Sequence, residues 1–163
     1  MQSLLDDKCI WATGSGETVT LESALEKIST HAKSGAKIFI GSDSSPKGER
    51  FVFATAICLH GSDSMSGGRY FFKKGSVPVK NMPTLFHRMT KEVQNAVDVA
   101  LYVDSKVPDA NIEIHIDIGE NPRGRTWRFV ESLTGYAKST GFPVKIKPEA
   151  WASASVADKH SKN

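Results

Sequence analysis

Residues 37–60, KIFIGSDSSPKGERFVFATAICLH, predict two antiparallel strands joined by a tight turn. KIFIGSD and RFVFATAICLH are rich in β-branched and aromatic residues, and the intervening SPKG contains turn-forming proline and glycine. RYFFKK at 69–74 predicts a third strand after the connection HGSDSMSGG at 60–68. The three strands together indicate an antiparallel meander.

Helices are predicted on both sides of this meander. An apolar stripe over 21–32 predicts an amphipathic helix, with Thr20 as its N-cap and Gly35 as its end. A second stripe over 83–103 predicts the longest helix. A strand at 111–117, a helix at 126–140, a strand at 143–147 and a terminal helix from about 153 complete the order. The fold class is therefore α/β: a mixed five-stranded sheet in which strands 1–3 form the meander and strands 4 and 5 are parallel, flanked by helices.

Size and composition predict one domain over residues 1–163, with an N-terminal helical extension at about 18–34. The chain has 163 residues, 39% of them hydrophobic. No apolar stretch approaches the roughly 20 residues that span a bilayer, and MQSLLDDK has acids where a signal peptide has lysines. Cys9 and Cys58 are far apart in the sequence, and Cys58, inside the apolar run FVFATAICL, is expected to be a buried free thiol, which indicates a reducing compartment. We expect a cytoplasmic protein without a membrane partner; the sequence leaves the oligomeric state open.

Acidic residues lie where the most β-like segments stop or bend. Asp43 ends IFIGSD, Asp117 lies within IEIHIDIG, and Asp158 falls in SVADKHSK. Glu92 adds a fourth carboxylate, at the margin of the apolar stripe of the longest helix. Carboxylates held close together repel one another unless divalent cations neutralise them. The pattern indicates a metal site built on the sheet.

Each of these acids also has a structural alternative. Asp43 shares a strand face with Gly41, which leaves room for a ligand or a backbone, but Asp-Ser-Ser-Pro is also a common turn opening. Glu92 could be a boundary glutamate paired with Arg88 four residues earlier, in which case Asp98 and Asp104 are the fallback acids. The spacing from Ser155 to Asp158 is that of a capping box. Asp117 is hardest to dismiss, because an unpaired charge near a sheet interior is costly.

Basic residues form three clusters that could contact phosphates. Their members are Lys73, Lys74 and Lys80 in one loop, Arg123, Arg125 and Arg128 in a second segment, and Lys159, His160 and Lys162 at the end. Two further aromatic residues, Trp127 and Trp151, could stack on bases, although both fall at positions typical of a core. His115 shares a face with Asp117 and could orient it, but a buried, hydrogen-bonded histidine is the simpler expectation.

Three segments carry a resemblance to a known family. IGSDS at 40–44, IHIDIGENPRG at 114–124 and KPEAWASASVADKHSK at 147–162 resemble the YkuK-like branch of the ribonuclease H-like superfamily. The resemblance extends from about Gly14 to the C-terminus, and Glu92 matches the helix-borne acid of such sites. It implies a two-metal nuclease acting on RNA, RNA/DNA hybrid or structured DNA, or a non-catalytic nucleic-acid-binding or partner-binding protein that keeps the fold.

The expected site holds two Mg²⁺ or Mn²⁺ ions, because oxygen ligands select hard cations. Asp43 is the expected bridging carboxylate, with Asp117 and Glu92 on one ion and Asp158 on the other. His160 is the expected proton shuttle or phosphate contact. Nucleic acid is the expected partner of the basic side chains, namely Arg123, Arg125, Arg128, Lys73, Lys74 and Lys159.

Two other activities are less compatible with the sequence. GSDSSPKG could be the phosphate loop of an actin-like phosphotransferase, but that architecture needs two domains around a nucleotide cleft. A phosphatase with Asp43 as nucleophile would need a second acid two residues later, where Ser45 stands.

Overall fold

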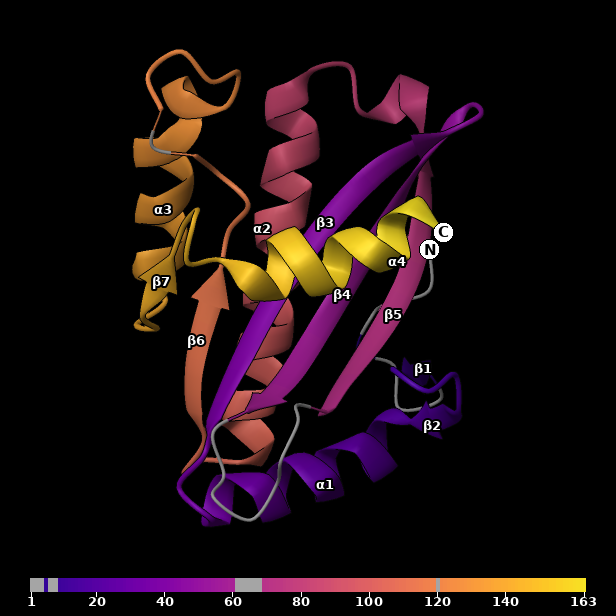
Figure 1. Ribbon diagram of the computed structural model, residues 1–163, viewed down its shortest axis with the longest axis vertical. Coiled ribbons are helices and arrows are strands. Elements are labelled where there is room, and N and C mark those ends of the chain that lie inside the picture. Colours follow the sequence, from indigo (N-terminus) through magenta and orange to yellow (C-terminus); the bar gives the residue numbers. More distant parts are fainter. Residues whose placement is uncertain (1–4, 6–8, 61–68, 120) are drawn as a thin grey trace.

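The computed structural model describes residue 5 and residues 9–60, 69–119 and 121–163. Its helices and strands follow the predicted order (Figure 1). In chain order they are β1 (Ile10–Thr13), β2 (Thr18–Thr20), α1 (Leu21–Lys33), β3 (Lys37–Lys47), β4 (Arg50–His60), β5 (Arg69–Pro78), the 3-10 helix η1 (Val79–Asn81), α2 (Leu85–Lys106), β6 (Asn111–His115), the 3-10 helix η2 (Trp127–Phe129), α3 (Val130–Lys138), β7 (Val144–Lys145), the π-helix η3 (Ala152–Ala157) and α4 (Asp158–Lys162).

The strands of the described residues form one mixed sheet in the order β2-β1-β5-β4-β3-β6-β7. β3, β4 and β5 are the predicted antiparallel meander, and β6 and β7 add to it in parallel. The α/β class and the five predicted strands are confirmed. The prediction of five strands is corrected to seven, because a short hairpin of β1 and β2 extends the sheet beyond β5. Residues 61–68 of the predicted connection lie outside the described residues.

Helix ends follow local capping chemistry. The Thr20 hydroxyl accepts a hydrogen bond from the Ser23 amide at 3.1 Å and so caps α1, as predicted. Gly35 has φ of +80°, which allows the chain to leave that helix. The chain turns there into β3, the strand that carries Asp43. In the part of the chain that is described, no helix has both the length and the apolar composition needed to cross a bilayer.

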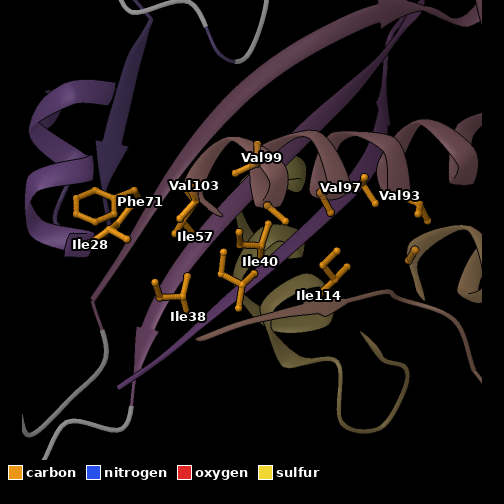
Figure 2. Packing of buried hydrophobic residues seen from close by; sticks show 14 of the residues in the cluster. Ile28, Ile38, Ile40, Ile57, Phe71, Val93, Val97, Val99, Val103 and Ile114 are labelled. Carbon is orange, nitrogen blue, oxygen red and sulfur yellow. The ribbon is translucent and has the colours of Figure 1, made fainter. Parts of the chain in front are cut away.

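The main core lies between the sheet and the helices α1 and α2 (Figure 2). Ile38, Ile40, Ile57 and Ile114 point from the sheet toward valines of α2, which are Val93, Val97, Val99 and Val103. The alternate residues of β3 point to the opposite face, where η3 and α4 cross the strands (Figure 1). Cys9 and Cys58 are both buried and neither is in a disulfide, so the buried thiol predicted at Cys58 is confirmed. One face of β3 therefore packs against α2, and its other face packs against η3 and α4.

β3 extends farther than its parallel neighbour β6. The register pairs Phe39 with Glu113 and Gly41 with His115, and β6 then ends. β3 continues to Lys47 along β4. Two residues beyond the last parallel pair, Gly41 and His115, β3 reaches Asp43 and the segment after β6 reaches Asp117. The uncovered edge of β3 is thus the place where these two acids meet.

Gly41 allows the π-helix η3 to pack directly on β3. A Cβ atom at this position would lie 2.5 Å from the Ser153 amide nitrogen and 2.8 Å from the Ala152 carbonyl carbon. Both are backbone atoms, so a side-chain rotation cannot relieve the contact. The close approach that the sequence suggested at Gly41 is made by backbone, and it holds the segment that precedes Asp158 against the sheet.

Gly41→Ala should therefore destabilise the protein by roughly 1–3 kcal/mol, the usual cost of an overpacked contact. Urea unfolding of the variant and the wild type measures the change. Gly75→Ala on β5 is the matched control, because its Cβ would meet nothing within 4 Å. Equal midpoints for Gly41→Ala and Gly75→Ala would contradict the packing of η3 on β3.

Candidate functional site

Asp43 is the most buried of the four predicted acids, with a relative exposure of 6%. Its Oδ2 accepts a hydrogen bond of 2.7 Å from the Ser161 hydroxyl on α4. Burial raises the pKa of Asp43 to about 6; the Ser161 hydrogen bond partly offsets this, and the neighbouring Asp117 and Asp158 raise it further. Asp43 is therefore placed where neutralisation by a proton or a cation is favoured. Its turn-capping alternative does not apply, because β3 continues through it.

Glu92 reaches the same strand from the other face of the sheet. It accepts a hydrogen bond from the hydroxyl of Ser44, the residue after Asp43. Burial raises the pKa of Glu92 to about 8. The Ser44 hydrogen bond acts in the opposite direction and lowers this pKa, while repulsion from Asp43 and Asp117 raises it further. Although part of its surface stays accessible, the carboxyl is closely surrounded by protein. Glu92 therefore belongs to the same electrostatic group as the strand acids.

Arg88 binds β3 and does not form the ion pair that was the structural alternative for Glu92. Its guanidinium donates to the hydroxyl and to the carbonyl of Ser44, both at 2.6 Å, and lies 4.6 Å over the Phe51 ring. Ser44 thus donates to Glu92 and accepts from Arg88. The arginine lowers the pKa of Glu92 only as a nearby charge.

Asp117 follows β6, with 18% of its side chain exposed. Its Oδ1 lies 2.8 Å from the Lys147 ammonium nitrogen. The two atoms form a close ion pair without hydrogen-bond geometry, so this buried oxygen has no hydrogen-bond partner. Asp117 is therefore neutralised by charge alone.

Asp158 begins α4 and lies close enough to Asp43 for the two carboxyl groups to share a hydrogen bond. It also forms a 2.9 Å ion pair with Lys162, one helical turn later. Ser155 lies inside η3 and η3 runs directly into α4, so the capping-box alternative is not realised. The side chain of Asp158 does not cap a helix and instead lies in the acidic group, paired with Lys162.

Together the four acids form one interacting group drawn from β3, α2, the end of β6 and α4. Each is engaged by a group of the protein: Asp43 by Ser161, Glu92 by Ser44, Asp117 by Lys147 and Asp158 by Lys162. As they stand, no three Asp, Glu, His or Cys side chains within the described residues are placed to hold a metal ion. Cation binding would require some of these local contacts to be exchanged.

Comparison with known proteins agrees with this architecture. A family model described as ribonuclease H-like matches residues 20–162. The chain belongs to the ribonuclease H-like family. It is also 23% identical over 160 residues to the protein YkuK of Bacillus subtilis (strain 168), covering 88% of this chain and 92% of that protein. No solved structure matches. The resemblance inferred from the sequence is confirmed for both family and fold.

His115 positions the last helices of this ribonuclease H-like domain. Its Nδ1 accepts a 3.1 Å hydrogen bond from the Ala152 amide, and its Nε2 lies 3.0 Å from Glu113 Oε1. Since Nδ1 is the acceptor, the ring is neutral with its proton on Nε2. Burial lowers the pKa of His115, which favours this neutral form. The expectation of a buried, satisfied histidine is correct, and its contact is to η3.

His160 lies against β5. Its ring stacks on Phe72 with centroids 3.6 Å apart, and its Nε2 is 2.9 Å from the Tyr70 hydroxyl. Burial lowers the pKa of His160, and the charges of Lys159 and Lys74 add to this effect. His160 therefore contacts aromatic residues of β5 and lies near basic side chains.

The predicted basic residues occupy two separate regions. Lys73 and Lys74 lie on β5, as the strand predicted at 69–74 requires, and not in a loop with Lys80; the Lys73 ammonium donates to the Ile10 carbonyl at 3.1 Å. Lys74 and the exposed Lys159 lie on the His160 side. Three exposed arginines flank the chain after Asp117; they are Arg123, Arg125 and Arg128.

The two tryptophans differ in exposure. Trp151 packs against Phe39 and His115, with centroids 4.9 Å and 5.5 Å away. Trp127 is 41% exposed, so the prediction that it is buried is wrong. The periodicity of 126–140 suggested one continuous helix, whereas a 3-10 turn at 127–129 precedes α3 and leaves the indole outside the core.

The neutralising partners of the acids were not found from the sequence. Lys162 had a signal, because it lies four residues after Asp158 on a helix. Lys147 and Ser161 had none, since tertiary structure brings them to Asp117 and Asp43. The fallback acid Asp98 lies elsewhere, in a pocket between α2 and β5 that Lys91 also lines.

Proposed function

We propose that this ribonuclease H-like protein is a metal-dependent nuclease that hydrolyses phosphodiester bonds in RNA, RNA/DNA hybrid or structured DNA. The observation that carries the proposal is the interaction of Asp43 with Asp117 and Asp158, and of Glu92 with Asp43 and Asp117. Four acids from separate segments would be a costly arrangement without a compensating function.

The donor set suits a hard divalent cation such as Mg²⁺ or Mn²⁺. All four groups are carboxylates, and the buried Asp117 Oδ1 has no hydrogen bond that a cation would have to replace. Asp43, Glu92, Asp117 and Asp158 would hold two such ions. When bound, the ions supply activation of a water molecule and stabilisation of the leaving oxygen.

Without cations, protons and lysine ammonium groups would offset the charge of these acids. With a pKa of about 8, Glu92 holds its proton at neutral pH in the absence of cations, and Asp43 is partly protonated near pH 6. Loading the site would release these protons, because the ligands bind as carboxylates. Lys147 and Lys162 would leave their acids and become available to a phosphate.

A second function is favoured by one specific observation. Lys147 and Lys162 already neutralise two of the four acids, as they would in a protein that binds nucleic acid without cutting it. The two functions differ in their response to cations.

Cleavage assays with labelled single-stranded RNA, single-stranded DNA, hybrid and duplex test the proposal. We expect Mn²⁺ or Mg²⁺ to support cleavage of at least one substrate and EDTA to abolish it. Saturating Mn²⁺ should raise the melting temperature by about 5 °C or more, because only the folded chain assembles the site. Nucleic-acid binding without cleavage or a melting shift in Mn²⁺ would support the non-catalytic function instead.

A further inference from the structure

A pocket opens between the first turn of α2 and the segment that follows Asp117. It has a volume of about 410 Å³ and is lined by Leu85, Pro122, Gly124, Arg125, Trp127 and Arg128. Its lining combines an exposed indole with two guanidinium groups and has no carboxylate. The pocket is therefore suited to a ligand that has both a flat apolar surface and negative charge.

The walls of this pocket are held by local contacts. The Gly124 amide donates to the Asn121 carbonyl at 2.8 Å, and the Arg123 amide donates to the Asn121 side chain at 3.0 Å, which fixes the turn before Trp127. On the other side, Phe129 packs on Phe86 with centroids 5.0 Å apart. The indole is thus presented by an ordered turn, so little conformational entropy is lost when a ligand binds.

The pocket lies along the same face of α2 as Glu92. Leu85, Arg88 and Glu92 are spaced by three and four residues and so share one side of the helix. Glu92 lies seven residues after Leu85, which corresponds to roughly 10 Å along the helix axis. That length equals about three stacked nucleotides at 3.4 Å each. A strand whose phosphate lay at the acids could place a nearby base in the pocket.

We propose that this pocket receives an unpaired base of a nucleic-acid strand, stacked on Trp127, with the adjoining phosphates bound by Arg125 and Arg128. The proposal deepens the proposed nuclease function by assigning a single-stranded substrate or a splayed strand end. Base faces inside a duplex are already stacked on their neighbours, so only an unpaired base can occupy the pocket. Arginine forks bind phosphate oxygens, and an aromatic ring accepts any base.

Fluorescence anisotropy in EDTA tests this binding without any cleavage. The probes are a labelled single-stranded 12-mer and the same strand in a duplex. Trp127→Ala should weaken binding of the single strand about tenfold, because stacking contributes roughly 1–3 kcal/mol per base. Trp127→Phe should stay within about threefold of the wild type, and duplex binding should not change with either variant.

Tyr136→Ala is the matched control, since Tyr136 on α3 is 40% exposed but does not line the pocket. It should bind both probes as the wild type does, and the urea midpoints of all variants should be alike. Wild-type affinity of Trp127→Ala for the single strand, or equal loss on both probes, would overturn the proposal. So would a wild-type protein that binds neither probe. Failure of the nuclease proposal is distinguishable, because it removes cleavage in Mn²⁺ and leaves the tryptophan-dependent binding in EDTA.

Discussion

Asp117→Asn should lower the rate of nucleic-acid cleavage by about a hundredfold or more while leaving the fold intact. The amide has the shape of the carboxylate but lacks the charge that would hold a cation, and electrostatic groups of this kind commonly contribute effects of that size. The fold should survive because Asp117 lies beyond the end of β6 and pairs with the half-exposed Lys147. Cleavage of a labelled strand in Mn²⁺ gives the rate, and urea unfolding gives the stability.

Asp104→Asn is the control for this experiment. Asp104 is an exposed acid on α2, away from the acidic group, so its substitution should change neither rate nor stability. Cleavage by Asp117→Asn within a few-fold of the wild-type rate would remove this residue from the mechanism.

Glu92→Gln should make the metal-free protein more stable than the wild type at alkaline pH, by on the order of 5 kcal/mol at pH 9, because each unit by which folding raises the pKa corresponds to about 1.4 kcal/mol. The pKa of Glu92 is raised from 4.5 to about 8 on folding, mainly by burial. Between these values the folded state holds a proton that the unfolded state has lost, so wild-type stability falls as pH rises through this range. Glutamine cannot ionise and avoids this loss, while its amide oxygen can still accept from Ser44.

Urea unfolding in EDTA at pH 4, 7 and 9 measures the difference between variant and wild type. The difference should be small at pH 4 and largest at pH 9. The lowered pKa of His115 makes the wild type less stable toward acid, but this contribution is shared by both proteins and cancels in the comparison. A constant difference across pH would show that Glu92 does not gain its proton on folding.

Much of the fold follows from two periodicities in the sequence. Alternation in KIFIGSD and NIEIHID placed Asp43 and Asp117 on strands whose other faces form the core, and the register of β3 with β6 brings them to the same edge. The β1–β2 hairpin was missed because strands of four and three residues are too short to establish a pattern. Their pairing depends on β5, which is distant in the sequence.

The four members of the acidic group could be predicted from the sequence, but the side chains that pair with them could not. Residue types and strand positions indicated the four carboxylates. The contacts of Asp117 with Lys147 and of Asp43 with Ser161 arise only when the last segment folds over the sheet. Helical periodicity also placed Trp127 in the core, because it gave no sign of the 3-10 turn that exposes the indole.

The central claim is that four carboxylates from four segments form one divalent-cation site. Anomalous diffraction from crystals soaked in Mn²⁺ tests it most directly. We predict two peaks enclosed by Asp43, Glu92, Asp117 and Asp158, with Lys147 and Lys162 moved away from their acids. A soaked crystal without a peak at this position, in which Asp117 still contacts Lys147 and Asp43 still accepts from Ser161, would contradict the account.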